Sequence, residues 1–524
     1  MWGIFEVLLT EIIERNARRW PHKEAVVSDN IRVTHAELLK RVERTASCLS
    51  GLGICKGDRV LVQMSNIIPY VELYFAVPKL GAILVPLNVR LTPTELPYYI
   101  SHTESICIIA DFERAEDMEK GLADWGEIRE RIVVGASIPG WRSFENMPPD
   151  DKAEWPSYDP SAENEVAYIY YTSGTTGRPK GAMWTNRQVI ENLVNLQLDL
   201  PLTPEDISLV AVNLAHGPSV LPVLHQTLYM GGKVVLYPGP QFKAEGFSDL
   251  AKKEGANTTL LVPTMLSRLL YQEGAGQDWF KDFKYIKYAA AKMDYKELRL
   301  AVERIKTRLT QGYGSTETVG GVTFLPPSEH DPRSPNLEVR LASAGREYQN
   351  VRVAVTNEQG RLLPPGEVGQ IVVRSDKNFA GYWRDPQSTA KTYREGWLLT
   401  GDLGRLDHEG YLYVMDRMAD MIISGGENIY AREVEDVLLS LSSVSECAVV
   451  GVPDPEWGES VWAFVKPFPG CVLTPETVIE FCKGRLSPYK KPRQVVFCQE
   501  LPKNIMGKVR KNILREEAQR HMET

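Results

Sequence analysis

The chain has 524 residues, with 60 Lys and Arg against 68 Asp and Glu, and a formal net charge of −8. This balance argues against a nucleic-acid binder, which usually has a basic excess or patch. The seven cysteines form no Cys-x-x-Cys pair, which argues against a disulfide framework or zinc site and favours a reducing, cytoplasmic compartment. No apolar run reaches the roughly 18–20 residues that a membrane-spanning helix needs.

The first half of the chain has the alternating helix and strand pattern of an α/β fold. Apolar residues from Ile4 to Ile13 recur at helical spacing, which predicts an amphipathic core helix ending before Pro21 rather than a signal peptide. Thr34 and Glu37 form a capping-box pattern that predicts the start of a second helix. Short apolar runs then predict buried parallel strands. These runs are 59–64, 132–134, 166–171, 207–212, 234–237 and 259–262.

After about residue 340 the pattern changes. Short strands at 351–355, 370–373 and 410–414 predict a small antiparallel unit. Beyond it, a helix at 432–441, strands at 446–452 and 461–466, and a helix opened by Thr474 and Pro475 predict an α+β segment. We therefore expect a large N-terminal domain of layered α/β subdomains over 1–417, with the β unit from about 340, and a small, mobile α+β C-terminal domain over 418–524.

The strongest local signal is Tyr171-Thr-Ser-Gly-Thr-Thr-Gly-Arg-Pro-Lys-Gly181. A strand leads into a loop in which backbone N–H groups, hydroxyls and one ammonium can converge on an anion. The spacing differs from a Walker A loop, because Lys180 is followed by glycine. A plain Gly/Ser/Thr surface loop is the structural alternative, but so particular a string favours a site for nucleotide phosphates.

This string resembles the phosphate-loop signature of the adenylate-forming superfamily: acyl-CoA synthetases, aryl-CoA ligases, luciferases and peptide-synthetase adenylation domains. The other family motifs follow in the same order, so the resemblance covers nearly the whole chain, which is most like an acyl- or aryl-CoA ligase. It implies ATP, Mg²⁺ and coenzyme A as cofactors and a small carboxylic acid as substrate, with no nucleic acid or membrane span; a homodimer stays open. The phosphate-loop residues implied for ATP are Thr172, Ser173, Gly174, Thr175, Thr176 and Lys180.

Gln311-Gly-Tyr-Gly-Ser-Thr-Glu317 resembles the second family motif. There the tyrosine stacks on adenine, the threonine binds the α-phosphate and the glutamate helps to hold Mg²⁺, roles that fall on Tyr313, Thr316 and Glu317. A flat ring suits a base, and a hard carboxylate suits Mg²⁺. A glycine turn with an exposed Glu is the structural alternative. The resemblance also places Gln311, Gly312, Gly314 and Ser315 at the nucleotide.

Residues 288–293 stand where the family has a Gly-Gly/Ala-Ala-Pro strand beside adenine, which implies nucleotide contacts for Ala289, Ala290 and Ala291. The chain departs there, with Ala289 for the usual glycine and Lys292 for proline. We expect the added methyl group of Ala289 to narrow the acyl pocket and disfavour long linear chains. A plain core strand is an equal alternative.

Three elements near the C-terminus complete the adenylation motifs. Asp402 and Arg417 match ribose-binding positions, Arg417 reaching ribose or phosphate. Lys508 matches the catalytic lysine that bridges the attacking carboxylate and the α-phosphate, although a lysine near a C-terminus is by default solvated. Ala419 occupies the hinge, where the family has Lys or Asp. Since a hinge needs only tolerant backbone angles, we expect alanine to shift the balance of domain orientations rather than abolish rotation.

The motifs for coenzyme A and the acyl group are fainter. The family places a glycine loop beside pantetheine, an aromatic ring on the coenzyme's adenine, and arginines on its phosphates, for which their planar fork is suited. The residues implied are Arg90, Gly425, Gly426, Trp457, Tyr489 and Arg493, each of which could instead be ordinary surface. His216 matches a position that gates the acyl pocket, although a lone histidine is usually structural.

The predicted function is an AMP-forming acid–thiol ligase that makes an acyl-adenylate, releases pyrophosphate, and transfers the acyl group to coenzyme A with release of AMP. An aromatic, alicyclic or medium-chain acid is the expected substrate. The alternatives are a ligase for longer fatty acids, luciferase-like chemistry, and a non-catalytic sensor of nucleotide or acyl-adenylate. Amino-acid activation is disfavoured, because no aspartate stands beside His216 and no carrier domain follows.

Overall fold

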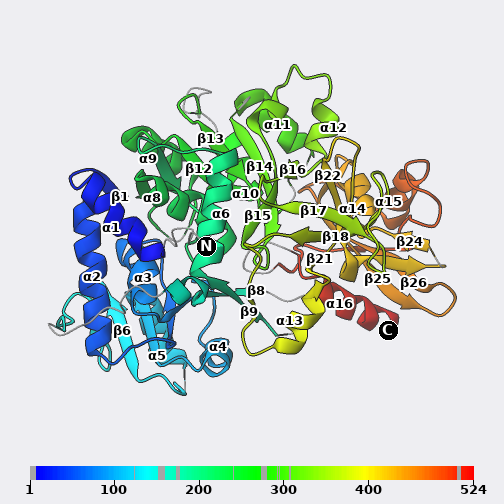
Figure 1. Ribbon diagram of the computed structural model, residues 1–524. Coiled ribbons are helices and arrows are strands. Elements are labelled where there is room, and N and C mark those ends of the chain that lie inside the picture. The colour runs from blue at the N-terminus through cyan, green and yellow to red at the C-terminus, as the bar shows by residue number, and fades with distance from the viewer. Residues whose placement is uncertain are drawn as a thin grey trace. The chain divides into compact units, whose positions relative to one another are not determined.

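The computed structural model describes residues 8–122, 124–150, 160–172, 178–239, 241–272, 280–291, 293, 295–305, 308–425, 427–503 and 509–523. The chain divides into two compact units (Figure 1). The first unit comprises Met1–Val353 and Val373–Leu398, and the second comprises Ala354–Val372 and Leu399–Thr524. The boundary between residues 417 and 418 stays a prediction.

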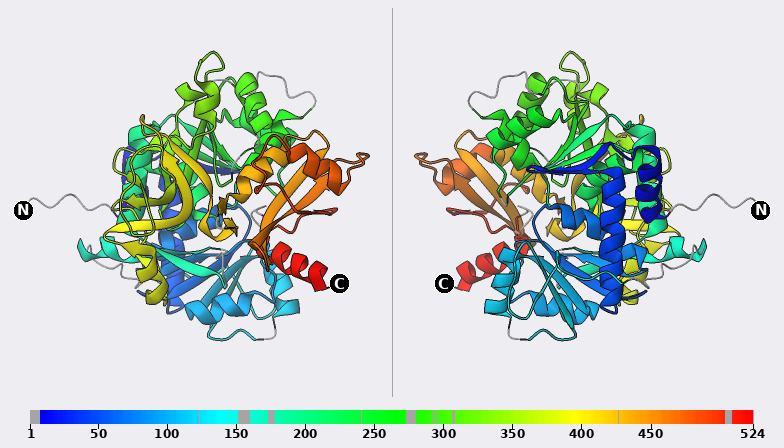
Figure 2. Two further views of the ribbon diagram at one scale, coloured as in Figure 1. Left: turned by 90° about the vertical axis from the view of Figure 1, so that its right-hand side faces the viewer. Right: turned by 90° about the vertical axis from the view of Figure 1, so that its left-hand side faces the viewer.

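An eight-stranded sheet of the first unit runs in the order β19-β9-β8-β4-β3-β5-β6-β7, with helices beside its strands (Figure 2). Its strands are β3 (Arg59–Gln63), β4 (Ile83–Pro86), β5 (Cys107–Asp111), β6 (Glu130–Val134), β7 (Arg142–Ser143), β8 (Val166–Thr172), β9 (Lys180–Thr185) and β19 (Gly381–Tyr382). The strands from β8 to β7 pair in parallel, as expected for buried apolar runs. Strands β9 and β19 are antiparallel additions at one edge.

A nine-stranded sheet of the same unit runs in the order β16-β15-β14-β13-β12-β10-β11-β1-β2. Its strands are β1 (Glu24–Ser28), β2 (Ile31–Thr34), β10 (Ile207–Val210), β11 (Lys233–Leu236), β12 (Thr258–Leu261), β13 (Tyr285–Tyr288), β14 (Leu309–Ser315), β15 (Gly320–Leu325) and β16 (Arg346–Glu347). The neighbouring strands β14, β13, β12, β10, β11 and β1 pair in parallel, in that spatial order. Strands β14 and β15 form an antiparallel hairpin.

Sequence signals predicted two of the helices in the first unit. Helix α1 (Leu9–Arg19) ends before Pro21, and α2 (His35–Gly51) opens with the capping box of Thr34 and Glu37, which confirms both predictions. The others are α3 (Ile68–Lys79), α4 (Leu96–Thr103), α5 (Phe112–Gly121), η1 (Pro160–Asn164), α6 (Asn186–Asp199), α7 (Gly217–Val220), η2 (Leu221–His225), α8 (Gln226–Met230), α9 (Ala244–Glu254), α10 (Pro263–Leu270), α11 (Tyr295–Ile305), η3 (Pro327–His330), α12 (Leu337–Leu341) and α13 (Pro386–Thr392).

The described residues in the later part of the chain form two further sheets and several helices. One sheet runs β17-β18-β21-β20 with β22 on β21, and the other runs β24-β23-β26-β25 with β27 on β26. The strands are β17 (Arg352–Thr356), β18 (Gly369–Arg374), β20 (Tyr393–Arg394), β21 (Trp397–Leu406), β22 (Leu412–Arg417), β23 (Ile422–Ser424), β24 (Glu427–Ile429), β25 (Val444–Asp454), β26 (Gly458–Pro467) and β27 (Gln494–Phe497). The helices are η4 (Met418–Asp420), α14 (Ala431–Leu439), α15 (Pro475–Cys482) and α16 (Lys511–Glu523). The Thr474 side chain caps α15, as predicted.

One predicted strand is wrong. Strand β13 ends at Tyr288, so Ala289, Ala290 and Ala291 form a bend rather than a strand beside the nucleotide. The cause is the backbone of Ala290, whose φ of +75° leaves the extended region and interrupts the ladder. Lys292 lies outside the described residues.

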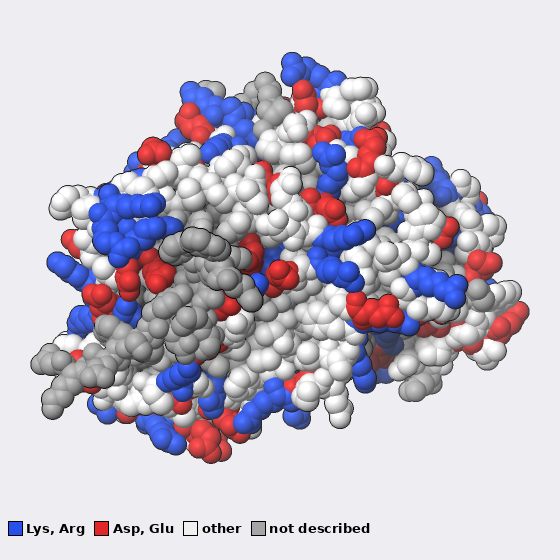
Figure 3. Space-filling model, in the orientation of Figure 1, with Lys and Arg blue, Asp and Glu red and all other residues white. Residues whose placement is uncertain are grey.

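On the face drawn in Figure 3, the described acidic and basic side chains are interspersed rather than gathered by sign. None of the described helices combines the length and the apolar character that a bilayer crossing requires.

Candidate active site

The phosphate-loop motif connects the paired strands β8 and β9. Thr172 at the end of β8 pairs with Lys180 at the start of β9, whereas Ser173, Gly174, Thr175 and Thr176 lie outside the described residues. The Lys180 ammonium donates to Ser388 Oγ over 2.7 Å and lies 5.1 Å from the centroid of the Tyr382 ring. The hairpin therefore holds the lysine of the motif at one edge of the eight-stranded sheet.

The loop after β14 carries Thr316 and Glu317 and is tied to this same edge. Trp184 Nε1 on β9 donates to the Thr316 carbonyl over 2.8 Å, and Phe379 N donates to the Glu317 carbonyl over 2.9 Å. The Tyr382 hydroxyl donates to Glu317 Oε1 over 2.8 Å. The structure thus brings Lys180, Thr316 and Glu317 together through strands β9 and β19.

Sequence reasoning missed Tyr382. Burial, followed by the neighbouring Glu317 carboxylate, raises the pKa of Tyr382, which keeps its hydroxyl protonated and able to donate. The hydrogen bond joins residues 65 positions apart, and no local pattern predicts such a contact. The nearest signal is the Gly381-Tyr382-Trp383 string, in which small and aromatic residues follow one another.

The adenine-binding prediction falls on β14 and its neighbour β13. Gln311 pairs in register with Tyr288, and a Cβ built on Gly312 would lie 4.0 Å from the Ala289 Cβ, so the two motifs face each other. Among the described residues, the buried Gln311 Oε1 has no hydrogen-bond partner. Since a buried polar atom normally has one, this oxygen suits the amino group of an adenine.

The rest of the second motif shapes the hairpin between β14 and β15. A Cβ at Gly314 would lie 2.1 Å from the Gly320 carbonyl oxygen, so only glycine allows this close approach. The Ser315 amide donates to Thr318 Oγ1 over 2.8 Å and closes the turn. Tyr313 lies between Gly312 and Gly314 and is half-buried.

His216 lies directly before helix α7, next to a close contact. A Cβ at Gly217 would lie 2.7 Å from both the Trp184 and the Tyr170 rings, so this glycine lets the His216 segment pack on the tryptophan that also holds Thr316. The half-buried His216 is therefore close in structure to the second motif through Trp184. Its role as a gate stays a prediction.

The predicted ribose and hinge residues lie in the second unit. Asp402 and Arg417 are paired in the antiparallel strands β21 and β22, with Arg417 Nε 3.4 Å from Asp402 Oδ1. The carbonyl of Ala419, in η4, accepts a 3.0 Å hydrogen bond from Arg515 on α16. Lys508 lies outside the described residues.

Three of the predicted coenzyme A residues come together in the second unit. The Gly425 amide donates to the Trp457 carbonyl over 2.8 Å, and a Cβ at Gly425 would lie 2.9 Å from that indole ring. The Arg493 guanidinium lies 4.6 Å from the ring centroid of Trp457, a cation–π arrangement. Tyr489 is exposed, Arg90 is an exposed residue of the first unit, and Gly426 lies outside the described residues.

The carboxylate of Glu317 has the chemistry that magnesium needs when it is bound together with a nucleotide. No cluster of three or more His, Cys, Asp or Glu side chains that could hold a metal occurs in the described ranges. Mg²⁺ typically takes one or two carboxylates together with substrate phosphates and water. The half-buried Glu317 carboxylate, oriented at one oxygen by Tyr382, matches that demand.

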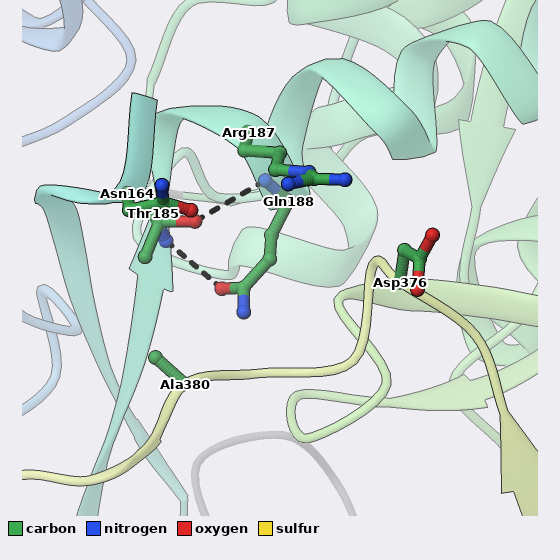
Figure 4. Close-up of a pocket in the computed structure, with 6 residues that line it drawn as sticks. All are labelled: Asn164, Thr185, Arg187, Gln188, Asp376 and Ala380. Atoms are coloured by element: carbon green, nitrogen blue, oxygen red, sulfur yellow. Dashed lines mark hydrogen bonds between the residues drawn. The ribbon is translucent and has the colours of Figure 1, made fainter. Parts of the chain in front are cut away.

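A separate polar hollow of about 350 Å³ lies beside the capped start of α6 (Figure 4). Thr185 and Gln188 exchange the hydrogen bonds of a capping box there. The hollow contains none of the predicted site residues. Its lining is Asn164, Thr185, Arg187, Gln188, Asp376 and Ala380.

Comparison with known proteins matches both parts of the chain to one family. The family model described as AMP-binding enzyme matches residues 13–383, and that of the AMP-binding enzyme C-terminal domain matches residues 433–508. A feruloyl-CoA synthase from Amycolatopsis sp. is 34% identical over 501 residues, covering 96% of this chain and 97% of its own. The long-chain-fatty-acid–CoA ligase FadD13 of Mycobacterium tuberculosis is 32% identical over 511 residues, covering 97% of each chain.

Solved structures agree with this match. ATP-bound MatB from Rhodopseudomonas palustris aligns with a TM-score of 0.86 at 29% identity, covering 98% of this chain and 99% of its own. The resemblance of the motifs is thereby confirmed, and the chain belongs to the AMP-binding enzyme family, the adenylate-forming superfamily that includes acyl- and aryl-CoA ligases.

Proposed function

We propose that Thr316, Glu317, Lys180 and Lys508 carry the adenylation step of an AMP-forming carboxylate–CoA ligase. A carboxylate resists nucleophilic attack because it is already anionic, so it must first receive a good leaving group. Its oxygen attacks the α-phosphorus of ATP, the bond to the β-phosphate oxygen breaks, and pyrophosphate leaves. The enzyme contributes position and electrostatic stabilisation.

The observation that carries this proposal is the group formed by Lys180, Tyr382 and Glu317. In this group the ammonium of Lys180 is available for phosphates, and the carboxylate of Glu317 is oriented by a hydrogen bond. Both lie near the loop of Thr316, at one edge of the eight-stranded sheet. When bound, Mg²⁺ supplies charge neutralisation on the phosphates, and Glu317 is the residue that would hold it. Lys508 then neutralises charge that develops between the carboxylate and the α-phosphate.

The second half-reaction transfers the acyl group to the coenzyme A thiol and releases AMP. We assign the coenzyme's adenine to Trp457, its phosphates to Arg493 and Arg90, and its pantetheine to the backbone of Gly425 and Gly426. The contact between Trp457 and Arg493 supports this assignment. Rotation of residues 418–524 about Ala419 would switch the enzyme from the first half-reaction to the second.

The seven free cysteines favour a reducing, cytoplasmic compartment for the protein.

For the substrate we infer an aromatic, alicyclic or medium-chain acid. The supporting observation is that Ala289, directly after the end of β13, faces Gly312 within β14, where an added methyl group removes space. A long linear chain needs a deep pocket, whereas a ring or short chain does not. A ligase for longer fatty acids is the alternative, and a catalytically silent sensor is the second.

The experiment is AMP release with ATP, Mg²⁺ and coenzyme A across acids from acetate through aryl acids to palmitate. Acid-dependent release, lowered at least about tenfold in Lys508→Ala as a transition-state contact is lost, supports the ligase assignment and ranks the acids. Preference for palmitate would overturn the substrate proposal. Silence with every acid while ATP still binds would favour the sensor, and sedimentation of the same sample tests for a homodimer.

A further inference from the structure

Lys377 is a fully buried lysine that has no part in the mechanism above. It lies in the turn after β18, and its exposed fraction is 0%. Its ammonium donates to the carbonyl oxygens of Gly321 over 2.5 Å and Thr318 over 3.1 Å, and to Asn192 Oδ1 over 3.0 Å. Burying an ammonium is costly unless it is paired and hydrogen-bonded. All of these acceptors are neutral oxygens, so the site is built from dipoles rather than from a counter-charge.

The carbonyls that accept from Lys377 belong to the turn that directly follows Glu317 and to the start of strand β15. This region has an unusual backbone, because the β-branched Val319 has a φ of +48° and Gly320 has a φ of +93°. A β-branched residue in this region is strained and persists only where its surroundings over-determine its backbone. Lys377 contributes to that constraint, because its ammonium also lies 3.5 Å from the carbonyl oxygen of Val319 itself.

The same short segment of chain holds Glu317 at two further points. Two residues beyond Lys377, the Phe379 amide donates to the Glu317 carbonyl over 2.9 Å. Further on, the Tyr382 hydroxyl donates to the Glu317 carboxylate over 2.8 Å. The segment 377–382 therefore holds this region at three points. These are the carbonyls after Glu317, the carbonyl of Glu317 itself and the carboxylate of Glu317.

We propose that Lys377 is a positioning residue that fixes the conformation of the loop Thr316–Gly321 and thereby aims the Glu317 carboxylate at the metal–nucleotide complex. This inference rests on the role proposed above for Glu317. Burial lowers the pKa of Lys377 to about 7, in agreement with an environment that lacks a counter-charge. Outer residues that orient metal ligands typically change metal affinity or activity about 10–100-fold when they are replaced.

The test is Lys377→Met, which keeps an unbranched side chain only one atom shorter and removes every donor. Mn²⁺ binding, followed by electron paramagnetic resonance with a non-hydrolysable ATP analogue, should weaken at least about tenfold. Pyrophosphate exchange should lose kcat at saturating Mg²⁺. Thioester formation from a supplied acyl-adenylate should change less than about twofold, because that half-reaction does not need the oriented carboxylate.

The matched control is Lys287→Met. Lys287 is also buried, its pKa is also lowered by burial to about 7, and its ammonium donates to the Pro222 carbonyl and Gln226 Oε1, away from the loop. Its loss should lower the melting temperature as the loss of Lys377 does, without weakening Mn²⁺ binding. The inference would be overturned if Mn²⁺ binding weakened equally in both variants, or if it did not weaken in Lys377→Met.

Should Lys377→Met fail to fold, Asn192→Ala removes only the one side-chain acceptor of the ammonium. Mn²⁺ binding should then weaken in the same direction by a smaller factor, and amide hydrogen exchange should rise at residues 318–321. Unchanged affinity and unchanged exchange contradict the proposal. A wild-type chain that releases no AMP with any acid refutes the proposed function, whereas an active wild type with an unaffected Lys377→Met refutes the positioning role alone.

Discussion

The hydroxyl of Tyr382 donates a 2.8 Å hydrogen bond to Oε1 of Glu317, and the face of the same ring lies 5.1 Å from the ammonium of Lys180. One aromatic side chain thus touches both the carboxylate proposed for the metal and the lysine of the phosphate loop. It donates to Oε1 of the carboxylate, and Oε2 is the oxygen that we propose for a metal ion.

Tyr382→Phe should therefore impair adenylation without unfolding the protein. The ring and its contact with Lys180 remain, but Glu317 loses its orienting donor, so pyrophosphate exchange should fall about 10–100-fold. Tyr237→Phe is the matched control, because its hydroxyl contacts the Lys243 carbonyl, away from Glu317. A rate in Tyr382→Phe that matches this control would show that Glu317 needs no orientation from Tyr382.

Ala289→Gly should widen the range of acids. Removing the methyl group that faces Gly312 opens the junction of β13 and β14, so KM for palmitate should fall while KM for benzoate changes little. One methylene group is worth roughly 0.8 kcal/mol of burial, so a change of about fourfold is the expected scale. The measurement is AMP release with each acid, and a parallel fall for both acids would argue against a specificity role.

Trp457→Ala should raise KM for coenzyme A and leave pyrophosphate exchange unchanged, because we propose that the indole ring acts in the second half-reaction alone. Loss of a stacking ring is worth about 1–3 kcal/mol per base, or about 5–150-fold in affinity. Phe481→Ala is a suitable control, since this ring also carries an arginine, Arg485, at 4.0 Å in the same unit. If both variants bind coenzyme A as the wild type does, the assignment of Trp457 is wrong.

Acid should destabilise the fold through its buried histidines. Burial lowers the pKa of His330 and His35 to about 4, and that of His225 to about 3, from 6.5. At a pH between the folded pKa and 6.5, each of these histidines binds more protons in the unfolded state than in the folded state. The free energy of unfolding should therefore fall as pH drops from about 6.5 towards 4, by ~1.4 kcal/mol per pH unit for each histidine, and stay constant in this respect above 6.5.

Urea denaturation at pH 7, 5.5 and 4.5 measures this slope. In His330→Gln the dependence of the unfolding free energy on pH should be shallower by the contribution of one histidine. The glutamine amide does not titrate, whereas the imidazole that it replaces, which contacts Tyr288 and the Pro326 carbonyl, does. An identical slope in the variant would mean that His330 does not titrate on unfolding in this range.

Local features of this protein could be predicted from the sequence, because their causes lie within a few residues. Thr34 and Glu37 cap α2, and Thr474 caps α15, through contacts three positions apart. The apolar runs became strands of parallel sheets, since an apolar run is stable only when buried on both faces. The motif of residues 311–317 marked the strand and loop that carry Thr316 and Glu317.

Only the tertiary structure decided how these residues are held. Lys377 reaches Gly321 across 56 positions and Tyr382 reaches Glu317 across 65, and neither contact has a local pattern. The bend at Ala290 was missed because a left-handed backbone at alanine is a local cost that surrounding structure imposes. The sequence by itself determined the family and the candidate site residues, through motif and residue type. Packing between distant segments determined their orientation, since a hydrogen bond depends on the position of two atoms in space rather than in the chain.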